Sequence, residues 1–375
     1  MEIKVKQRII EGRASYERIG EVVDGLGAKK LLLVFTEPVK FLPVWDYINS
    51  IDAKVVPFCD FTSNPKYEEV EAGVELFNSE KCDAIVAIGG GSAIDVAKCI
   101  KLYCKMPKGE IYLKQEYADS GVPLIAMPTT AGTGSESTPF AVIYYGGVKQ
   151  SVHHESILPS VAVLDSDVLI GLPVYQKKCT VLDALCQAIE SYWSVHSTDE
   201  CKTYAKAAIE KIRDNIFEYV EENTERAREE IMSAANLAGR AICITATTAP
   251  HAMSYKITSL YGFPHGHAVA IGLYRVWKYM LENGEKCTDK RGFDYLLSTF
   301  NEIANALGYD CPEAAIEGFK AMLDRLEIGD PCEKGDLSSA AETLAASVNV
   351  ERLGNNPVSL DKEALLKIYM EMLEK

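Results

Sequence analysis

Three of the six histidines in this 375-residue chain lie in one short stretch, from Thr247 to Leu273. They are His251, His265 and His267. Neutral imidazole is a common ligand of Zn²⁺ and Fe²⁺, so the stretch could form part of a metal site. The alternative is a helix end that carries a few solvated or hydrogen-bonded histidines. A metal site would need a carboxylate from another part of the chain.

The segment VLDALCQAIESYW supplies a carboxylate in an apolar setting. Asp183 and Gln187 are four residues apart and share one face of the predicted helix. The residues around Asp183 are mostly apolar, which indicates a largely buried helix. A buried carboxylate needs a partner, and a cation can serve. Asp183 with His251 and His265 would suit Zn²⁺ or Fe²⁺ and leave a position for substrate.

Two loops rich in small residues predict a nucleotide site. Gly89-Gly90-Gly91-Ser92 lies between a buried strand and a helix, where glycines allow close approach and the helix amides can bind a pyrophosphate. The G-x-G-x-x-G fingerprint is absent, and a tight turn is the alternative. Pro128–Glu136 follows a later strand and offers hydroxyls and amides. Both loops are expected at the carboxyl edge of one parallel sheet, where α/β proteins bind ligands.

The order of predicted elements indicates two domains. Roughly the first 160 residues alternate strands and helices, as in KKLLLVF, AKVVPF, the strand before the triple glycine, VPLIAMP, AVIYY and VAVLD. From Val174 onward the apolar residues recur at helical spacing. We therefore predict a Rossmann-like parallel α/β domain over residues 1–172 and an all-helical domain over residues 173–375.

Composition excludes several classes of protein. A net charge of −15 argues against nucleic-acid binding, which needs clustered Lys and Arg. No apolar run approaches the roughly 18 to 20 residues of a membrane span, and the charged N-terminus is unlike a signal peptide. The eleven cysteines form no C-x-x-C pair and suit reduced thiols in the cytoplasm.

The motifs GGGSAIDVAK, PTTAGTGSE, LDALCQAIES and HAMSY…PHGHA occur in the order found in a known family. In this the chain resembles the iron-containing (group III) alcohol dehydrogenases, most closely their phosphonoacetaldehyde reductase-like branch. The resemblance implies the dehydroquinate synthase-like architecture, with an N-terminal dinucleotide-binding domain and a helical metal- and substrate-binding domain. It also implies hydride transfer between NAD(P)H and an alcohol/aldehyde pair.

The resemblance assigns roles to residues of this sequence. The implied metal ligands are Asp183, Gln187, His251 and His265. The residues expected to contact the dinucleotide are Thr36, Glu37, Asn64, Gly89, Gly90, Gly91, Ser92, Asp95, Thr129, Thr130, Thr133 and Lys149.

Two positions depart from the family pattern. Gln187 replaces a ligand that is usually histidine, and an amide oxygen is the weaker, harder ligand. The site could therefore rest on three ligands, as in the related glycerol dehydrogenases that use zinc. Tyr255 stands where relatives often carry a histidine associated with proton relay. His267 and Tyr255 are the catalytic candidates here, and for His267 an ordinary structural role is the alternative.

The cofactor, metal and substrate follow as expectations. An acidic residue after the second strand commonly holds the NAD ribose, and here the sequence reads VFTEPVK. Thr36 at that position would admit NADP(H), the preferred reading, and Glu37 would favour NAD(H). The metal is expected to be Fe²⁺ or Zn²⁺, and a phosphonate would need nearby cations, for which the candidates are Lys149, His153, His154, Arg240 and Lys256.

Other functions on the same scaffold stay open. A polyol dehydrogenase, a dehydroquinate synthase-like lyase and a non-catalytic binding protein are the alternatives. Few Lys and Arg near the ligands argue against the lyase, and the retained ligands argue against the non-catalytic protein. The partner is expected to be a small alcohol or aldehyde, and the protein a homodimer.

Overall fold

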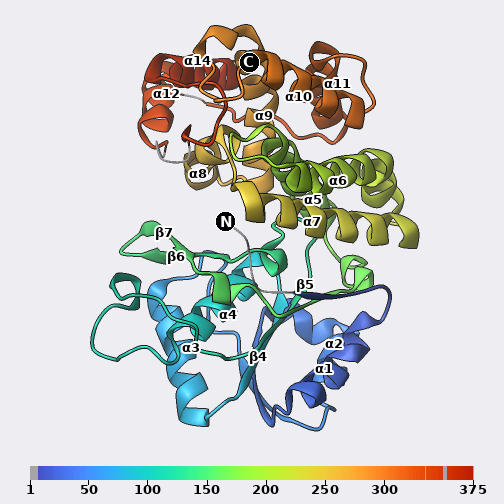
Figure 1. Cartoon of the computed structure of the whole chain (residues 1–375), viewed down its shortest axis with the longest axis vertical. Helices are drawn as coiled ribbons and strands as arrows, with labels where there is room; N and C mark the ends of the chain where they lie inside the picture. The colour runs from blue at the N-terminus through green and yellow to red at the C-terminus, as the bar shows by residue number, and fades with distance from the viewer. Residues whose placement is uncertain (1–6, 334, 349–352, 375) are drawn as a thin grey trace. The chain divides into compact units, whose positions relative to one another are not determined.

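A computed structural model gives the fold of the chain (Figure 1). It describes residues 7–333, 335–348 and 353–374. The chain divides into two units, Met1–Leu172 and Pro173–Lys375.

The first unit is built on a six-stranded sheet in the order β1-β8-β5-β4-β2-β3, in which every pair is parallel. Its strands are β1 (Arg8–Glu11), β2 (Lys30–Phe35), β3 (Lys54–Phe58), β4 (Ala84–Gly89), β5 (Leu124–Pro128) and β8 (Val161–Leu164). Its α-helices are α1 (Ile19–Leu26), α2 (Pro43–Ile48), α3 (Tyr67–Glu80) and α4 (Gly91–Tyr103). Its 3₁₀ turns are η1 (Ser15–Arg18), η2 (Glu37–Phe41), η3 (Tyr112–Lys114), η4 (Ser135–Ser137), η5 (Glu155–Ile157) and η6 (Ser166–Leu169).

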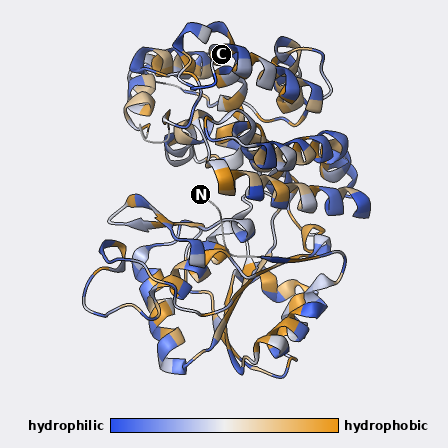
Figure 2. Cartoon of the chain, in the orientation of Figure 1, coloured by the Kyte–Doolittle hydropathy of each residue, from blue (hydrophilic) through white to orange (hydrophobic). Residues whose placement is uncertain are grey.

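The central strands are aliphatic because both faces of the sheet are covered. Every residue of β4, AIVAIG, is buried, and so is every residue of β5. Figure 2 shows the strands of this sheet as hydrophobic over most of their length. Such continuous apolar runs are typical of parallel strands between two helical layers. The predicted parallel α/β unit is confirmed.

The strand order reverses its direction between β2 and β4. The chain runs from β2 outward to β3 and then returns to the other side of β2 to form β4. Such a reversal opens a crevice at the carboxyl ends of the two strands. Phe35 at the end of β2 pairs with Ile88 of β4, so Thr36 and Gly89 both lie at this crevice.

The predicted strand AVIYY belongs to a different sheet. It forms β6 (Phe140–Tyr145), which pairs antiparallel with β7 (Val148–His153). Gly146 and Gly147 connect the two strands with φ of 58° and 78°. Positive φ at both central residues is the geometry of a tight hairpin turn, which glycine adopts readily. The sequence analysis predicted neither β7 nor the edge strand β1 of the main sheet.

The second unit is helical throughout its described residues, apart from one isolated β-bridge between Cys287 and Val358. Its α-helices are α5 (Val174–Trp193), α6 (Asp199–Phe217), α7 (Glu225–Thr245), α8 (Ala249–Tyr261), α9 (His265–Glu282), α10 (Phe293–Ala306), α11 (Pro312–Arg325), α12 (Leu337–Ala346) and α14 (Lys362–Leu373). A π-helical turn, η7 (Glu218–Glu222), extends α6, and a 3₁₀ turn, η8 (Gly284–Lys286), follows α9. The predicted helical domain is confirmed.

Helix α5 lies at the centre of the helical unit. Every residue from Cys179 to Trp193 is buried, and this run includes the polar residues Asp183, Gln187 and Glu190. Trp193 at its end packs edge-on against Trp277 of α9 and Phe300 of α10. The helix that carries Asp183 is therefore packed into the core of this unit.

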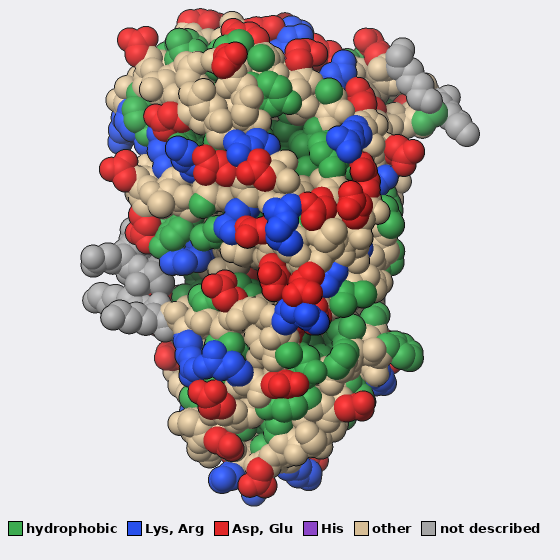
Figure 3. All heavy atoms as spheres, turned by 90° about the vertical axis from the view of Figure 1, so that its right-hand side faces the viewer, with side chains coloured by type: hydrophobic (Ala, Val, Ile, Leu, Met, Phe, Trp, Pro, Cys, Tyr) green, Lys and Arg blue, Asp and Glu red, His purple; other side chains and the backbone are tan. Residues whose placement is uncertain are grey.

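The surface carries mixed charge. On the face drawn in Figure 3, Lys and Arg side chains are interspersed with Asp and Glu rather than gathered into one basic area. None of the helices in the described part of the chain combines the length and apolar character that a membrane span requires.

Candidate metal and dinucleotide sites

Three helices of the second unit bring together a carboxylate and two imidazoles. Asp183 comes from α5, His251 from the first turn of α8 and His265 from the first residue of α9. Asp183 Oδ1 lies 3.3 Å from His251 Nε2 and 3.9 Å from His265 Nε2. One ligand atom from each residue lies within 4.8 Å of the other two. The two Nε2 atoms thus converge on the same carboxylate oxygen.

The opposite nitrogens of both imidazoles are held by the protein. His251 Nδ1 is hydrogen-bonded to the carboxylate of Glu190, and His265 Nδ1 lies 3.3 Å from the Ser254 hydroxyl. Ser254 in turn donates to the backbone oxygen of His251 at 2.8 Å. Metal-binding histidines are usually held in this way, because the second nitrogen fixes the orientation of the ring.

The cluster fits a divalent cation. Asp183 Oδ1 and His251 Nε2 are both buried and make no hydrogen bond within the described chain. Burial acts to raise the pKa of Asp183, but His251 and His265 outweigh it and lower the pKa. Burial acts to lower the pKa of His251, but Glu190 and Asp183 raise it to about 9. The site therefore favours a positive charge, which a divalent metal would supply.

Gly266 allows His265 to reach the cluster. A Cβ atom at this position would lie 1.9 Å from the backbone oxygen of Cys179 and 2.8 Å from Cβ of Asp183. Only a residue without a side chain lets the start of α9 approach α5 so closely. The sequence motif PHGHA thus has a packing reason for its glycine, between two histidines with different surroundings.

The remaining candidates of the helical unit have distinct places. Gln187 is buried on the Asp183 face of α5, and its side chain hydrogen-bonds to Asp183 in a way that lowers the carboxyl pKa. Tyr255 stacks on His265 with ring centroids 5.8 Å apart and an interplanar angle of 2°. Both side chains therefore border the metal cluster.

His267 points to other partners. Its Nδ1 lies 2.8 Å from the Tyr175 hydroxyl and its Nε2 lies 2.7 Å from the backbone oxygen of Gly329. The ring also stacks on Phe263, and burial lowers its pKa. Both ring nitrogens are engaged, an arrangement that favours the structural alternative for this residue.

Glu190 contacts the candidate site through His251 and was not among the residues predicted from the sequence. It lies one turn beyond Gln187 and is fully buried. The spacing Asp183, Gln187, Glu190 follows one helical face, and this periodicity is the signal that could have revealed it.

The triple glycine forms a closely packed cradle in the first unit. A Cβ on Gly89 would lie 2.7 Å from Cβ of Ala93 and 3.2 Å from Thr36 Oγ1, and one on Gly91 would lie 3.0 Å from Thr133 Oγ1. Gly90 is the N-cap residue of α4 and supplies no side-chain cap, so the first amides of the helix, at Gly91 and Ser92, are suited to bind an anion.

Backbone and side-chain contacts tie the two loops together. The Thr129 amide donates to the oxygen of Gly89 at 2.9 Å, and a Cβ on Gly90 would lie 3.7 Å from the Thr130 side chain. The predicted cofactor residues from the triple glycine and the second loop therefore lie side by side at the carboxyl edge of the sheet.

Asp95 has an internal role in this cradle. It accepts hydrogen bonds from Ser135 Oγ at 2.6 Å and from the Val142 amide at 2.9 Å. The fully buried Lys98 donates to Ser135 Oγ and to the backbone oxygen of Phe140. This network joins α4 to the second loop and to the β6–β7 hairpin, where Lys149 lies.

The other predicted cofactor residues follow β2 or β3 or lie in the first turn of α4. Thr36 is half-buried beside Gly89, whereas Glu37 is exposed and pairs with Lys40 at 2.9 Å. Ser92 donates through its hydroxyl to the backbone oxygen of Ser63, which precedes the exposed Asn64.

Several side chains predicted to bind a phosphonate contact other residues of the same unit. Arg240 lies over the Tyr204 ring and donates to its hydroxyl at 2.6 Å. His154 caps η5, and the His153 ring lies 5.0 Å from that of Phe140.

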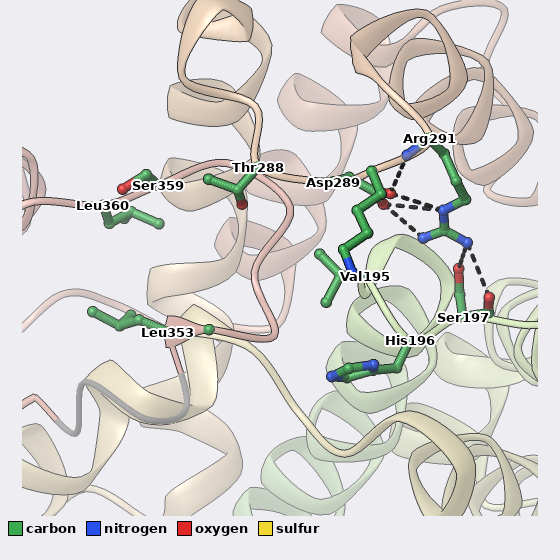
Figure 4. Close-up of a pocket in the computed structure, with 11 residues that line it drawn as sticks. Val195, His196, Ser197, Thr288, Asp289, Arg291, Leu353, Ser359 and Leu360 are labelled. Atoms are coloured by element: carbon green, nitrogen blue, oxygen red, sulfur yellow. Dashed lines mark hydrogen bonds and ion pairs between the residues drawn. The ribbon is translucent and has the colours of Figure 1, made fainter. Parts of the chain in front are cut away.

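A separate pocket of about 800 Å³ lies in the helical unit (Figure 4). Among its lining residues, Arg291 is held by Asp289 and by backbone oxygens of Ser194 and Ser197. The lining includes none of the metal-cluster residues, so this pocket is distinct from the candidate metal site.

Comparison with known families places the chain. Residues 6–166 match the family described as iron-containing alcohol dehydrogenase, and residues 178–373 match the C-terminal region of the Fe-containing alcohol dehydrogenase family. The chain belongs to the iron-containing alcohol dehydrogenase family, a family of oxidoreductases, as the sequence motifs predicted.

Individual relatives differ in length and name. Aldehyde-alcohol dehydrogenase 2 of Entamoeba histolytica is 32% identical over 74% of this chain, which spans only 34% of that protein. The phosphonoacetaldehyde reductase of Streptomyces viridochromogenes is 31% identical over 88% of this chain and 85% of that protein. The 1,3-propanediol dehydrogenase of Klebsiella pneumoniae is 33% identical over 72% of this chain and 73% of that protein.

Solved structures share the architecture. An iron-containing alcohol dehydrogenase from Thermococcus thioreducens aligns with a TM-score of 0.86 at 27% identity, over 98% of both chains. A sulfoacetaldehyde reductase from Bifidobacterium kashiwanohense, in complex with NAD⁺, aligns with a TM-score of 0.87 at 26% identity, over 98% of this chain and 97% of that one.

Proposed function

We propose that this protein is a metal-dependent, NAD(P)H-linked alcohol dehydrogenase that reduces a small aldehyde. The observation that carries the proposal is the convergence of His251 Nε2 and His265 Nε2 on the buried Asp183 carboxylate. Fe²⁺ or Zn²⁺ would be held by these three side chains, with Gln187 as the fourth ligand.

The cofactor and the metal divide the chemistry between them. When bound, the metal polarises the carbonyl oxygen as a Lewis acid and the reduced nicotinamide supplies the hydride. The protein binds the dinucleotide phosphates through Gly89–Ser92 and the amides at the start of α4. Tyr255, stacked on His265, is the nearer proton donor to the ligands, whereas both nitrogens of His267 are engaged elsewhere.

The proposed cofactor is NADP(H). Thr36, rather than the exposed Glu37, lies against Gly89 at the end of β2. A neutral hydroxyl at this place tolerates a 2′-phosphate, whereas a carboxylate there would favour the ribose diol of NAD(H).

Phosphonoacetaldehyde is the leading substrate candidate, with 2-hydroxyethylphosphonate as its product. The proposal is supported by the relative named phosphonoacetaldehyde reductase, which this chain covers over most of its length. The structural neighbour named sulfoacetaldehyde reductase also takes its name from an aldehyde with an acidic group. An anionic substrate would need local positive charge, because the chain carries a net charge of −15.

A diol dehydrogenase is the second candidate. The 1,3-propanediol dehydrogenase of Klebsiella pneumoniae supports it at a similar level of identity. We further propose that the protein is cytoplasmic, in keeping with its free cysteines, and that it is a homodimer.

One set of assays tests the proposed function. Purified protein is analysed for bound metal, and oxidation of NADPH and NADH is followed with aldehydes that include phosphonoacetaldehyde and sulfoacetaldehyde. Oxidation of 1,3-propanediol is measured in the reverse direction. We expect Fe²⁺- or Zn²⁺-dependent turnover that Asp183→Ala abolishes. Absence of turnover with every aldehyde and diol in the presence of either metal would overturn the proposal.

A further inference from the structure

Glu190 makes an unusual set of contacts for an acidic residue. It lies in α5, fully buried, and its Oε1 accepts from the Thr248 amide and the Thr248 hydroxyl, both at 2.9 Å. The same oxygen accepts from the His251 amide at 3.4 Å. Its Oε2 is hydrogen-bonded to His251 Nδ1. One carboxylate thus contacts both the backbone and the ring of a candidate metal ligand.

The contact with Nδ1 sets the form of the imidazole. A carboxylate oxygen accepts hydrogen bonds, so Nδ1 of His251 carries the proton that points toward Glu190 Oε2. In the neutral ring the lone pair then lies on Nε2, the atom that faces Asp183 at 3.3 Å. Glu190 therefore presents His251 in the tautomer that a metal needs.

The backbone contacts cap helix α8. Thr248 is its N-cap residue, and its side chain makes no capping hydrogen bond to the helix. Glu190 instead accepts from the amides of Thr248 and His251, supplied from a different helix. A negative charge at a helix N-terminus is also favourable for the helix dipole. The start of α8, which carries His251, is anchored directly to α5, which carries Asp183.

The second imidazole has a hydroxyl beside its Nδ1 atom. His265 Nδ1 lies 3.3 Å from Ser254 Oγ, whose one proton is donated to the backbone oxygen of His251 at 2.8 Å. Ser254 Oγ therefore faces His265 Nδ1 as a neutral acceptor, whereas Glu190 faces His251 Nδ1 with a carboxylate oxygen. A carboxylate is the stronger acceptor of the two.

We propose that Glu190 is a positioning residue of the metal centre, which fixes the tautomer and place of His251 while capping α8. The inference rests on the proposed metal-dependent function, because it takes Asp183, His251 and His265 as ligands. Glu190 is not itself a ligand in this proposal. It acts through His251.

The test compares Glu190→Gln with Thr248→Val in the full-length protein. Glu190→Gln keeps the size of the side chain but removes the charge that selects the Nδ1–H form. Thr248→Val removes the hydroxyl that donates to Glu190 and accepts from Trp193 Nε1, and it leaves the contact of Glu190 with the imidazole. Zn²⁺ affinity is measured by competition with a chromophoric chelator, and amide exchange is followed by mass spectrometry in the peptide spanning residues 247–253.

We expect Glu190→Gln to lower Zn²⁺ affinity about 10- to 100-fold and to speed amide exchange at the start of α8. Thr248→Val should speed exchange but keep the Zn²⁺ affinity within about threefold of the parent, since Glu190 Oε2 keeps its contact with His251 Nδ1. A merely structural role for Glu190 predicts that the two variants change affinity equally, and that result would overturn the proposal. So would an unchanged affinity in Glu190→Gln.

Two further outcomes remain informative. If Glu190→Gln does not fold, Glu190→Asp replaces it, because the shorter carboxylate keeps the charge and shifts the contact with Nδ1. An unchanged Zn²⁺ affinity in that variant overturns the proposal. If the parent binds Zn²⁺ tightly but reduces no aldehyde, the proposed function fails while the role of Glu190 is still decided by the affinities.

Discussion

The burial of Asp183 is what makes its carboxylate a candidate metal ligand. A carboxylate that is 3% exposed cannot rely on water, so the groups around it must supply positive charge or hydrogen-bond donors. His251, His265 and Gln187 are the neighbours that lower its pKa. Of these, only Gln187 cannot carry a charge, so it is the weakest member of the proposed ligand set.

Replacing Gln187 by histidine tests that weakness. We expect Gln187→His to raise Zn²⁺ affinity about tenfold, or about 1.4 kcal/mol, because imidazole is the better ligand for a borderline metal. Chelator competition measures the change. Gln187→Leu serves as the control without a ligand atom and should not bind more tightly than the parent. An affinity unchanged or reduced in Gln187→His would show that position 187 does not face the metal.

Thr36 gives a second prediction at a single position. A carboxylate beside Gly89 would repel the 2′-phosphate of NADPH and accept from the ribose diol of NADH. Thr36→Asp should therefore lower the NADPH-to-NADH ratio of kcat/KM by at least about tenfold, roughly 1.4 kcal/mol. Glu37→Gln, at the exposed neighbouring position, should change the ratio much less. Equal ratios in Thr36→Asp and the parent would remove Thr36 from the site.

At the scale of elements, the sequence predicted those parts whose signal is local. The aliphatic strands, the glycine turn after β4 and the helical periodicity of α5 all depend on neighbours within a few residues, and each was found in the structure. Asp183 was recognised as buried because its immediate neighbours are apolar.

Long-range pairings were beyond such reasoning. Glu190 meets Thr248 across 58 positions of sequence, and His267 meets Gly329 across 62. Helical spacing places Glu190 on the face of Asp183, but no local pattern indicates its partner Thr248 or the partner of His267, whose role therefore stayed open. The strand β6 was recognised as a strand, but its partner β7 was not, because a polar strand such as VKQSVH carries little hydrophobic alternation.

Packing of α9 against α5 leads to a prediction at this scale. Gly266→Ala would place a methyl group within 1.9 Å of the Cys179 backbone oxygen, so the start of α9 must move away and take His265 with it. We expect a loss of about 1–3 kcal/mol in unfolding free energy and a weaker metal site. Gly272→Ala, on the same helix with no atom within 4 Å of the new Cβ, is the matched control. Denaturant unfolding and Zn²⁺ titration of both variants check the prediction, which fails if the two behave alike.

For the whole molecule, the placement of the two candidate ligand sites in different units has consequences for stability. The candidate metal ligands all fall in Pro173–Lys375, and the candidate dinucleotide residues all fall in Met1–Leu172. A ligand that binds only the folded state stabilises the part of the chain that holds it. The two ligands should therefore stabilise the protein through separate sets of residues.

Thermal unfolding with each ligand tests this separation. Metal at 100 times its Kd should stabilise the folded protein by about 2.7 kcal/mol, and a dinucleotide at the same relative concentration should do so equally. Asp183→Ala should lose the metal-induced rise in Tm and retain the rise induced by dinucleotide. Gly91→Val, which would crowd Thr133, should show the reverse. Loss of both effects in either variant would mean that the two sites depend on one another, and that the division of ligands between the units does not extend to their energetics.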